Sequence, residues 1–193
     1  MIIRDVLKPE LRVVFCGTAL GTKSAQLRAY YAGPGNAFWP TLYRIGLTPR
    51  QLRPEEYRSL LTYGIGLTDL CKVRSGSDKA IGYDAFDVAD FAAKLRRYSP
   101  GWVAFNGERA AEVLFGKRVS YGEHPERVAG IPVFVLPSTS LEPRRASRAG
   151  PPRSTRTGAP IHRPPRSRPR DPRPHDPVRK APCLCFPRAP RRS

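Results

Sequence analysis

An apolar run that stops at a glycine, with a second glycine close behind it, constrains the fold most. Residues 12–17 read RVVFCG, which is typical of a buried strand, and the next residues, TAL, lead to Gly21. A loop then carries YYAGPGNAFW at residues 30–39 and enters a helix through Phe38 and Trp39. A strand, a glycine-bracketed turn and an aromatic loop that opens a helix are suited to hold a flat ring beside a phosphate group.

Strand-like and helix-like segments alternate along the first 140 residues. Thr48-Pro49 is typical of a helix start, and Asp84 is a candidate cap for a later helix that stops before Pro100. The alternation predicts a three-layer α/β/α sandwich with a mostly parallel central sheet. The expected strands are 12–17, 65–70, 102–106 and 132–136, and the expected helices are 38–45, 48–61, 84–99 and 108–115.

Polar or glycine residues mark the carboxyl end of each expected strand. They are residues 17–21, Thr68 with Asp69, Asn106 with Gly107, and residues 138–140. Ligands of such folds bind at the carboxyl ends of parallel strands, so these residues are the candidate site. A nucleobase is the first ligand to consider.

The composition changes abruptly after Ser140. Residues 1–140 carry 19 Lys and Arg against 13 Asp and Glu, a net of +6, whereas residues 141–193 carry 15 against 3, a net of +12. Of the 22 prolines, 13 lie in this shorter second part. We therefore expect a folded domain at 1–140 and a disordered Arg/Pro-rich tail at 141–193, because the tail has too few apolar residues to offset the entropy of ordering. Two hypotheses for the tail are translation in a shifted frame and a basic arm that binds phosphate.

No leader or membrane span is expected from the sequence. The N-terminus has no apolar segment of the signal-peptide kind, and the apolar runs are strand-length. These features predict a cytoplasmic protein, associated with the nucleoid if it binds DNA. Cys16 and Cys71 fall on expected strands as small buried residues, and Cys183 and Cys185 have no metal-binding spacing, so no metal or cofactor is predicted.

Nucleotide-binding signatures are weak or missing. The turn GTALG lacks the three glycines of a dinucleotide fingerprint, and no phosphate-binding loop of the G-x-x-x-x-G-K-[ST] kind is present. Five motifs in order, RVVFCGTALG, AGPGNAFW, LTPRQL, GIGLTDL and VFVLPSTS, instead resemble the mismatch-specific uracil-DNA glycosylase family, relatives of thymine-DNA glycosylase. The resemblance covers residues 1–140. It implies an α/β/α sandwich that flips a uracil or mispaired thymine out of DNA and cleaves the bond between base and sugar.

The resemblance assigns roles to several of the residues at the strand ends. Tyr31 takes the position that stacks on the flipped base, with Tyr30 beside it, and stacking contributes about 1–3 kcal/mol per base. Backbone N–H groups near Thr18 and Asn36 are candidates to stabilise the departing base, although Asn36 is better explained as a helix cap. Asn106 is a candidate for pocket hydrogen bonding or a plain turn residue.

The first motif departs from the family at Ala19. Many members read G-I-N-P-G there, and the asparagine positions the attacking water, which a methyl group cannot do. Loss of one such contact costs about 10²–10³ in rate. Asp69 in GIGLTDL is the best replacement, because a carboxylate at a strand mouth can polarise water, and its alternative role is to cap the following loop.

The last motif ends at the point where the tail begins. Ser138, Thr139 and Ser140 resemble the start of the loop that the family lays along DNA, and serine hydroxyls suit phosphate contacts. The family's inserting loop and closing helix are missing after Ser140, which leaves apolar sheet surface uncovered. The leading prediction is thus a monofunctional, monomeric DNA glycosylase with uracil-containing or mismatched duplex, or single-stranded DNA, as partner. The alternatives are a catalytically weak or inactive nucleic-acid-binding remnant and a nucleotide-using enzyme of doubly wound fold.

Overall fold

A computed structural model describes residues 3–76 and 81–140. Its central sheet has five strands in the order β2-β1-β3-β5-β4, of which the first four run parallel and β4 pairs antiparallel with β5. The strands are β1 (Val13–Leu20), β2 (Ile65–Ser75), β3 (Val103–Asn106), β4 (Gly122–Val128) and β5 (Ile131–Leu136). The mostly parallel sheet that the sequence predicts is confirmed.

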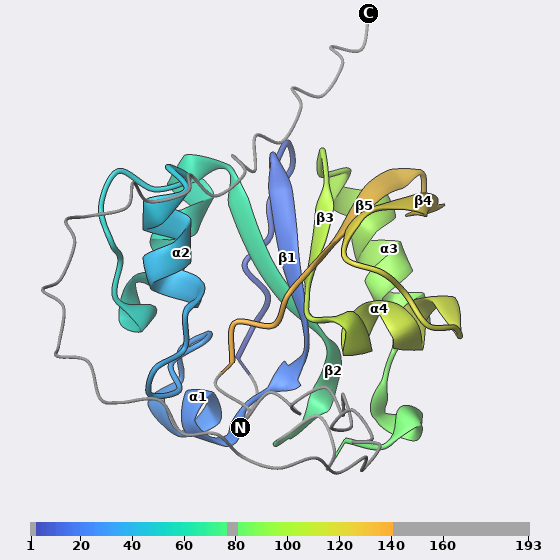
Figure 1. The fold of residues 1–193 in the computed structure, drawn as a ribbon, viewed down its shortest axis with the longest axis horizontal. Helices are drawn as coiled ribbons and strands as arrows, with labels where there is room; N and C mark the ends of the chain where they lie inside the picture. The colour runs from blue at the N-terminus through green and yellow to red at the C-terminus, as the bar shows by residue number, and fades with distance from the viewer. Residues whose placement is uncertain (1–2, 77–80, 141–193) are drawn as a thin grey trace, which may run out of the picture. The chain divides into compact units, whose positions relative to one another are not determined.

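Helices cover the sheet on both faces, which confirms the three-layer sandwich (Figure 1). One hydrophobic cluster packs α2 and η1 against the sheet through residues such as Trp39 and Leu60. A second cluster packs α3 and α4 through residues such as Phe91 and Ala111. The helices are α1 (Thr22–Leu27), α2 (Phe38–Arg44), α3 (Val88–Tyr98) and α4 (Glu108–Phe115), with 3₁₀ turns at η1 (Pro54–Tyr63) and η2 (Tyr83–Ala85).

The expected turn at residues 17–21 is wrong, because β1 continues to Leu20. The neighbouring strand β2 is eleven residues long, so it pairs with Gly17 and Ala19 as well as with the apolar part of β1. Asp69, expected at the end of its strand, accordingly lies within β2 and pairs in register with Gly17. These strands end where hydrogen-bond partners on the neighbouring strand end. A single sequence does not reveal those partners.

Two expected helix starts are also wrong. The Thr48 hydroxyl donates to the Arg50 carbonyl instead of accepting from a helix, and the segment becomes a 3₁₀ helix that starts at Pro54, a residue suited to a first turn. Asp84 lies in η2, whereas Asp87 caps α3 by accepting from the backbone N–H of Asp90. For α3, a second aspartate three residues downstream of the expected cap makes the actual start.

Two elements were missed altogether. The short helix α1 interrupts the segment expected to be a long loop, and β4 adds an antiparallel strand beside β5. Strand β4 has the sequence GEHPERV and is mostly exposed, so it lacks the apolar pattern by which strands are recognised. The helix α1 has six residues, too few for a periodic pattern to be visible.

The connection order places a crevice between β1 and β3. The chain passes from β1 outward to β2 and then returns to add β3 on the other side of β1. Pairing of β1 with β3 ends at Cys16–Phe105, while pairing of β1 with β2 continues to Ala19. This strand-order reversal is where parallel α/β sheets bind ligands.

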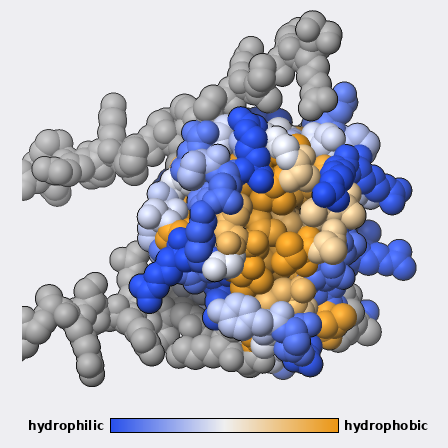
Figure 2. All heavy atoms as spheres, turned by 90° about the vertical axis from the view of Figure 1, so that its right-hand side faces the viewer, coloured by the Kyte–Doolittle hydropathy of each residue, from blue (hydrophilic) through white to orange (hydrophobic). Residues whose placement is uncertain are grey.

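Apolar side chains remain visible on one side of the molecule. Figure 2 looks onto the side that bears α3 and α4 and shows an apolar centre ringed by hydrophilic residues. Partly buried residues packed against the second cluster include Val113, Leu114 and Val119. Cys16 and Cys71 are buried free thiols, as expected, whereas the predicted disordered tail with Cys183 and Cys185 lies outside the described residues. In the described part of the chain no helix is long and apolar enough to cross a membrane.

Candidate active site

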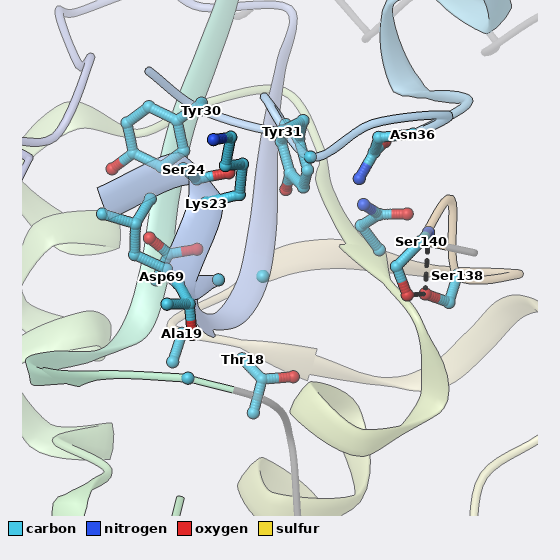
Figure 3. Close-up of a pocket in the computed structure, with 17 residues that line it drawn as sticks. Thr18, Ala19, Lys23, Ser24, Tyr30, Tyr31, Asn36, Asp69, Ser138 and Ser140 are labelled. Atoms are coloured by element: carbon cyan, nitrogen blue, oxygen red, sulfur yellow. Dashed lines mark hydrogen bonds between the residues drawn. The ribbon is translucent and has the colours of Figure 1, made fainter. Parts of the chain in front are cut away.

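A cleft of about 440 Å³ opens at the crevice between β1 and β3 (Figure 3). Its size falls in the range of small-molecule sites. Each of the four strand ends predicted from the sequence contributes residues to it, so four segments far apart in the sequence form one site, although Thr68, Gly107 and Thr139 are not among its lining residues. The lining includes Gly17, Thr18, Ala19, Lys23, Tyr30, Tyr31, Asn36, Asp69, Asn106, Ser138 and Ser140.

Asp69 and Tyr31 meet across Gly17 at the floor of the cleft. A Cβ on Gly17 would lie 2.6 Å from the Asp69 carboxylate oxygen Oδ1 and 3.5 Å from the Tyr31 hydroxyl. Only a residue without a side chain leaves the Asp69 carboxylate in this place, whereas the Tyr31 hydroxyl would be in ordinary contact with a Cβ. Figure 3 shows both side chains among the residues that line the cleft, with Lys23 and Ser24 drawn between them in this view.

Tyr31 is held rigidly with its hydroxyl in the protein interior. Its ring stacks on Phe38 with 3.9 Å between centroids and 24° between planes, and its backbone has a positive φ of 53°, which is strained for a residue other than glycine. The hydroxyl oxygen is buried without a regular hydrogen-bond partner among the described residues. Burial and the Asp69 carboxylate raise the pKa of Tyr31 well above its ordinary value, with the Asn106 amide acting in the opposite sense, so the phenol stays neutral.

Tyr30 is a core residue, not a second stacking wall. Its ring is 1% exposed and packs edge-on against Tyr57, and its backbone carbonyl accepts from the Trp39 indole at 3.1 Å. The Tyr30 hydroxyl accepts a hydrogen bond from Lys72 Nζ at 2.8 Å. Burial and the nearby Asp69 carboxylate raise the pKa of Tyr30, so it too remains a neutral phenol.

Asn106 anchors the loop that follows β5. Its amide nitrogen donates to the Thr139 hydroxyl at 2.8 Å, and its amide oxygen accepts from the Thr139 backbone N–H at 3.2 Å. The Thr139 carbonyl in turn accepts from the Ala37 backbone N–H at 2.9 Å, just before α2. The exposed hydroxyls of Ser138 and Ser140 lie 3.0 Å apart at the rim of the cleft. Asn106 therefore fixes the rim to the start of α2.

Asn36 contacts the start of α2 and also faces the cleft. Its side-chain oxygen accepts from the Phe38 backbone N–H at 3.0 Å in the turn before α2, whose N-cap is Ala37, while its amide nitrogen points toward the cleft in Figure 3. Thr18 lines the cleft with its side chain 6% exposed, and in Figure 3 this side chain points away from the space between Asp69 and Tyr31. Only the backbone of Thr18 can serve a ligand in that space.

Ala19 lies at the mouth of the cleft in the last part of β1. Its methyl group packs toward a small apolar cluster formed by Cys71, Ile81 and Ala85. A methyl group offers no hydrogen bond to a water molecule. The polar group near the cleft floor that can take a proton from water is the Asp69 carboxylate, which is 5% exposed.

Sequence reasoning missed Lys72, Asp5 and Lys23. Lys72 Nζ lies 3.5 Å from Asp69 Oδ2, and Asp5 lies next to Lys72. Lys23 is an exposed residue of α1 that lines the cleft. On a regular strand, residues three apart such as Asp69 and Lys72 point to opposite faces, so no sequence pattern marked this pair, and none marked Asp5. Within residues 3–76 and 81–140, no three His, Cys, Asp or Glu side chains are grouped so that they could hold a metal ion.

Two comparisons show which known proteins this chain resembles. The sequence profile described as the uracil DNA glycosylase superfamily matches residues 4–155, so the match extends past Ser140. The chain is also similar to the solution NMR structure of a Methanosarcina acetivorans protein provisionally assigned as a uracil DNA glycosylase, with 26% sequence identity and a TM-score of 0.53. That similarity covers 77% of this chain and 91% of the other.

The profile spans most of the sequence, including each strand and each residue of the cleft. The similar structure has the same kind of α/β fold. The chain belongs to the uracil DNA glycosylase superfamily, whose members are hydrolases that act on DNA as glycosylases.

Proposed function

We propose that this protein is a monofunctional DNA glycosylase of the mismatch-specific and thymine-DNA glycosylase branch, which excises uracil or a mispaired thymine in base-excision repair. The observation that carries the proposal is the meeting of the Asp69 carboxylate and the Tyr31 ring across Gly17 on the floor of one cleft. The carboxylate can accept a proton from water, and the aromatic ring can stack on a nucleobase.

The Tyr31 ring supports the binding of a flipped base. A nucleobase reaches a cleft of this kind only when it leaves the DNA stack. Stacking on an aromatic ring then offsets about 1–3 kcal/mol of the stacking free energy that the base has lost. Phe38 packs against one face of the Tyr31 ring, so the wall is already in place before the substrate arrives. Asn36 adds an amide nitrogen that can donate to an oxygen of the base.

Hydrolysis follows from the position of Asp69. In the proposed reaction a water molecule attacks C1′ of the sugar while the bond from C1′ to the base nitrogen breaks, and its electron pair leaves with the base. The proton of the water passes to the Asp69 carboxylate, which must therefore be ionised beforehand. The same negative charge stabilises the positive charge that develops on the sugar.

The rim of the cleft supports contacts to the DNA backbone. The hydroxyls of Ser138 and Ser140 and the ammonium of Lys23 lie around the opening and are groups that bind phosphate oxygens. Asn106 holds this rim in place through Thr139. We propose that the protein acts as a monomer on duplex or single-stranded DNA in the cytoplasm, at the nucleoid.

The test is excision from defined oligonucleotides by the full chain and by Asp69→Asn. Single-stranded DNA with one uracil, duplexes with U·G and U·A pairs, and a T·G mismatch are incubated with excess enzyme, and alkali-labile abasic product is measured. We expect abasic sites at uracil and a loss of about 10²–10⁴ in rate for Asp69→Asn, the usual contribution of a general base. Strand cleavage without alkali would contradict the monofunctional assignment.

Ala19 favours a second function, the binding of damaged DNA without excision. The cleft keeps its aromatic wall and its phosphate-binding rim whether or not a water molecule is activated. Preferential binding of uracil-containing DNA with no abasic product under single-turnover conditions would support this function and rule out the glycosylase. Free nucleotides bound in preference to DNA would exclude both.

A further inference from the structure

A partly buried network of two carboxylates and two ammonium groups lies behind Asp69. Lys72 Nζ is 2.5 Å from Asp5 Oδ1 and 3.5 Å from Asp69 Oδ2, and it donates to the Tyr30 hydroxyl at 2.8 Å. Lys94 Nζ is 2.8 Å from the other Asp5 oxygen. The network therefore runs without a break from helix α3 to the floor of the cleft.

Three segments distant in the sequence build this network. Asp5 is fixed beside β2 because Val6 and Leu67 exchange two backbone hydrogen bonds, of 2.9 and 3.0 Å. The Thr68 hydroxyl donates to Asp5 at 2.8 Å, so the carboxylate has a third fixed donor. The side chains of Lys72 and Asp5 are only 20% and 16% exposed. Groups so far from bulk water keep a charge only when a partner compensates it.

The Lys72 ammonium interacts more strongly with Asp5 than with Asp69. Asp5 lies 1 Å closer to the ammonium than Asp69 does, and Lys94 also compensates Asp5. Burial acts to raise the pKa of the Asp5 carboxyl, but Lys72, with hydrogen bonds from Lys94 and Thr68, outweighs burial and holds this pKa below its ordinary value. Asp5 is thus ionised at neutral pH and lies closer to Lys72 than Asp69 does, so the ion pair between Lys72 and Asp69 is the looser of the two.

A looser ion pair suits a carboxylate that must accept a proton. A buried carboxylate with no cation nearby becomes protonated and cannot take a proton from water, whereas a tight pair with an ammonium lowers its basicity. Other titratable groups that face Asp69 are Tyr30, Tyr31 and Cys16, and burial keeps all three neutral by raising the pKa of each. Lys72 Nζ lies within 4 Å of the Asp69 carboxylate, so its positive charge favours the ionised form of Asp69.

We propose that Lys72 is a positioning residue that keeps Asp69 ionised and oriented, and that Asp5 tunes it by holding the ammonium at a distance from Asp69. The inference rests on the proposed function only for its catalytic consequence. The ion network and its effect on Asp69 are testable without any turnover. A purely structural network would affect stability but would not set the protonation of Asp69.

The experiment measures the protonation midpoint of Asp69 directly. The full 193-residue chain is labelled with ¹³C at the aspartate carboxyls, the Asp69 signal is assigned by its loss in Asp69→Asn, and its shift is followed by NMR against pH. We expect Lys72→Met to raise the midpoint by about one pH unit or more, the usual effect of losing a cation at this distance. Lys72→Arg should restore it to within about half a unit because the charge is kept. Asp5→Asn should lower the midpoint, since a negative charge is removed and Lys72 is freed for Asp69.

Matched controls separate this inference from the proposed function. Lys117→Met removes a lysine from an exposed ion pair with Glu126 and should leave the Asp69 midpoint unchanged. An unchanged midpoint in Lys72→Met, or a rise in Asp5→Asn, would overturn the inference, and Asp5→Asn decides the matter if Lys72→Met does not fold. Absence of abasic product with the wild type would instead refute the proposed function and leave the measured midpoints standing. Where excision occurs, the pH at which the excision rate falls on the acidic side should shift together with the Asp69 midpoint.

Discussion

The replacement of Gly17 by alanine tests the geometry of the cleft most sharply. The added Cβ would lie 2.6 Å from Asp69 Oδ1, and ordinary contacts begin near 3.4 Å, so the carboxylate must move by roughly 0.8 Å. The backbone of Gly17 is that of a strand and needs no glycine, so the contact with Asp69 is the reason for the effect. A misplacement of about 1 Å in a catalytic group costs about 10²-fold in rate.

The assay is single-turnover excision of uracil from an oligonucleotide, together with thermal unfolding. We expect Gly17→Ala to fold, because overpacking by one methyl group costs about 1–3 kcal/mol, and to excise uracil about 10²-fold more slowly. Gly33→Ala is the matched control, since Gly33 also lines the cleft but a Cβ there meets nothing within 4 Å. It should retain activity within about threefold and gain up to about 1 kcal/mol of stability. Equal rates for the two variants would refute the reasoning.

Three further predictions concern stacking, the rim and pH. Tyr31→Phe should keep the excision rate within about threefold and leave the free energy of unfolding unchanged or raised, because the buried hydroxyl has no regular partner among the described residues. Tyr31→Ala should instead lose about 1–3 kcal/mol of binding free energy for uracil-containing DNA, measured by fluorescence titration. Asn106→Ala should lower the free energy of unfolding in urea by about 1–3 kcal/mol, because Thr139 loses both partners. Asp5 has a lowered pKa in the folded state, so its contribution to stability is present above its ordinary pKa near 4 and is lost as the pH falls below it. In urea unfolding, the free energy of unfolding should therefore fall more between pH 6 and pH 3 for the wild type than for Asp5→Asn.

The parallel sheet and the location of the cleft were predictable because they follow from local patterns and a general rule. The apolar runs around Phe15 and Val103 mark buried strands, and the carboxyl ends of parallel strands meet at one edge. Gly17, Asp69 and Asn106 consequently line one cleft although they are separated by dozens of residues. The roles assigned to them remain predictions.

The strand ends and the ion network were not predictable from local patterns. Strand β1 runs past Gly17 because β2 offers backbone partners up to Ser75, and such pairing is a property of two strands together. Asp5 faces Lys72 because Val6 bridges to Leu67, a contact across about sixty residues of chain. The stacking of Phe38 on Tyr31 likewise depends on where α2 docks.

The rate of uracil excision by Asp69→Asn, relative to the unaltered full chain under single-turnover conditions, tests the central claim most directly. The account predicts that the wild type leaves abasic sites at uracil and that the asparagine variant, which keeps the size of the side chain but cannot take a proton, is slower by about 10²-fold or more. Excision at the same rate by both proteins would contradict the assignment of Asp69 as the group that activates water.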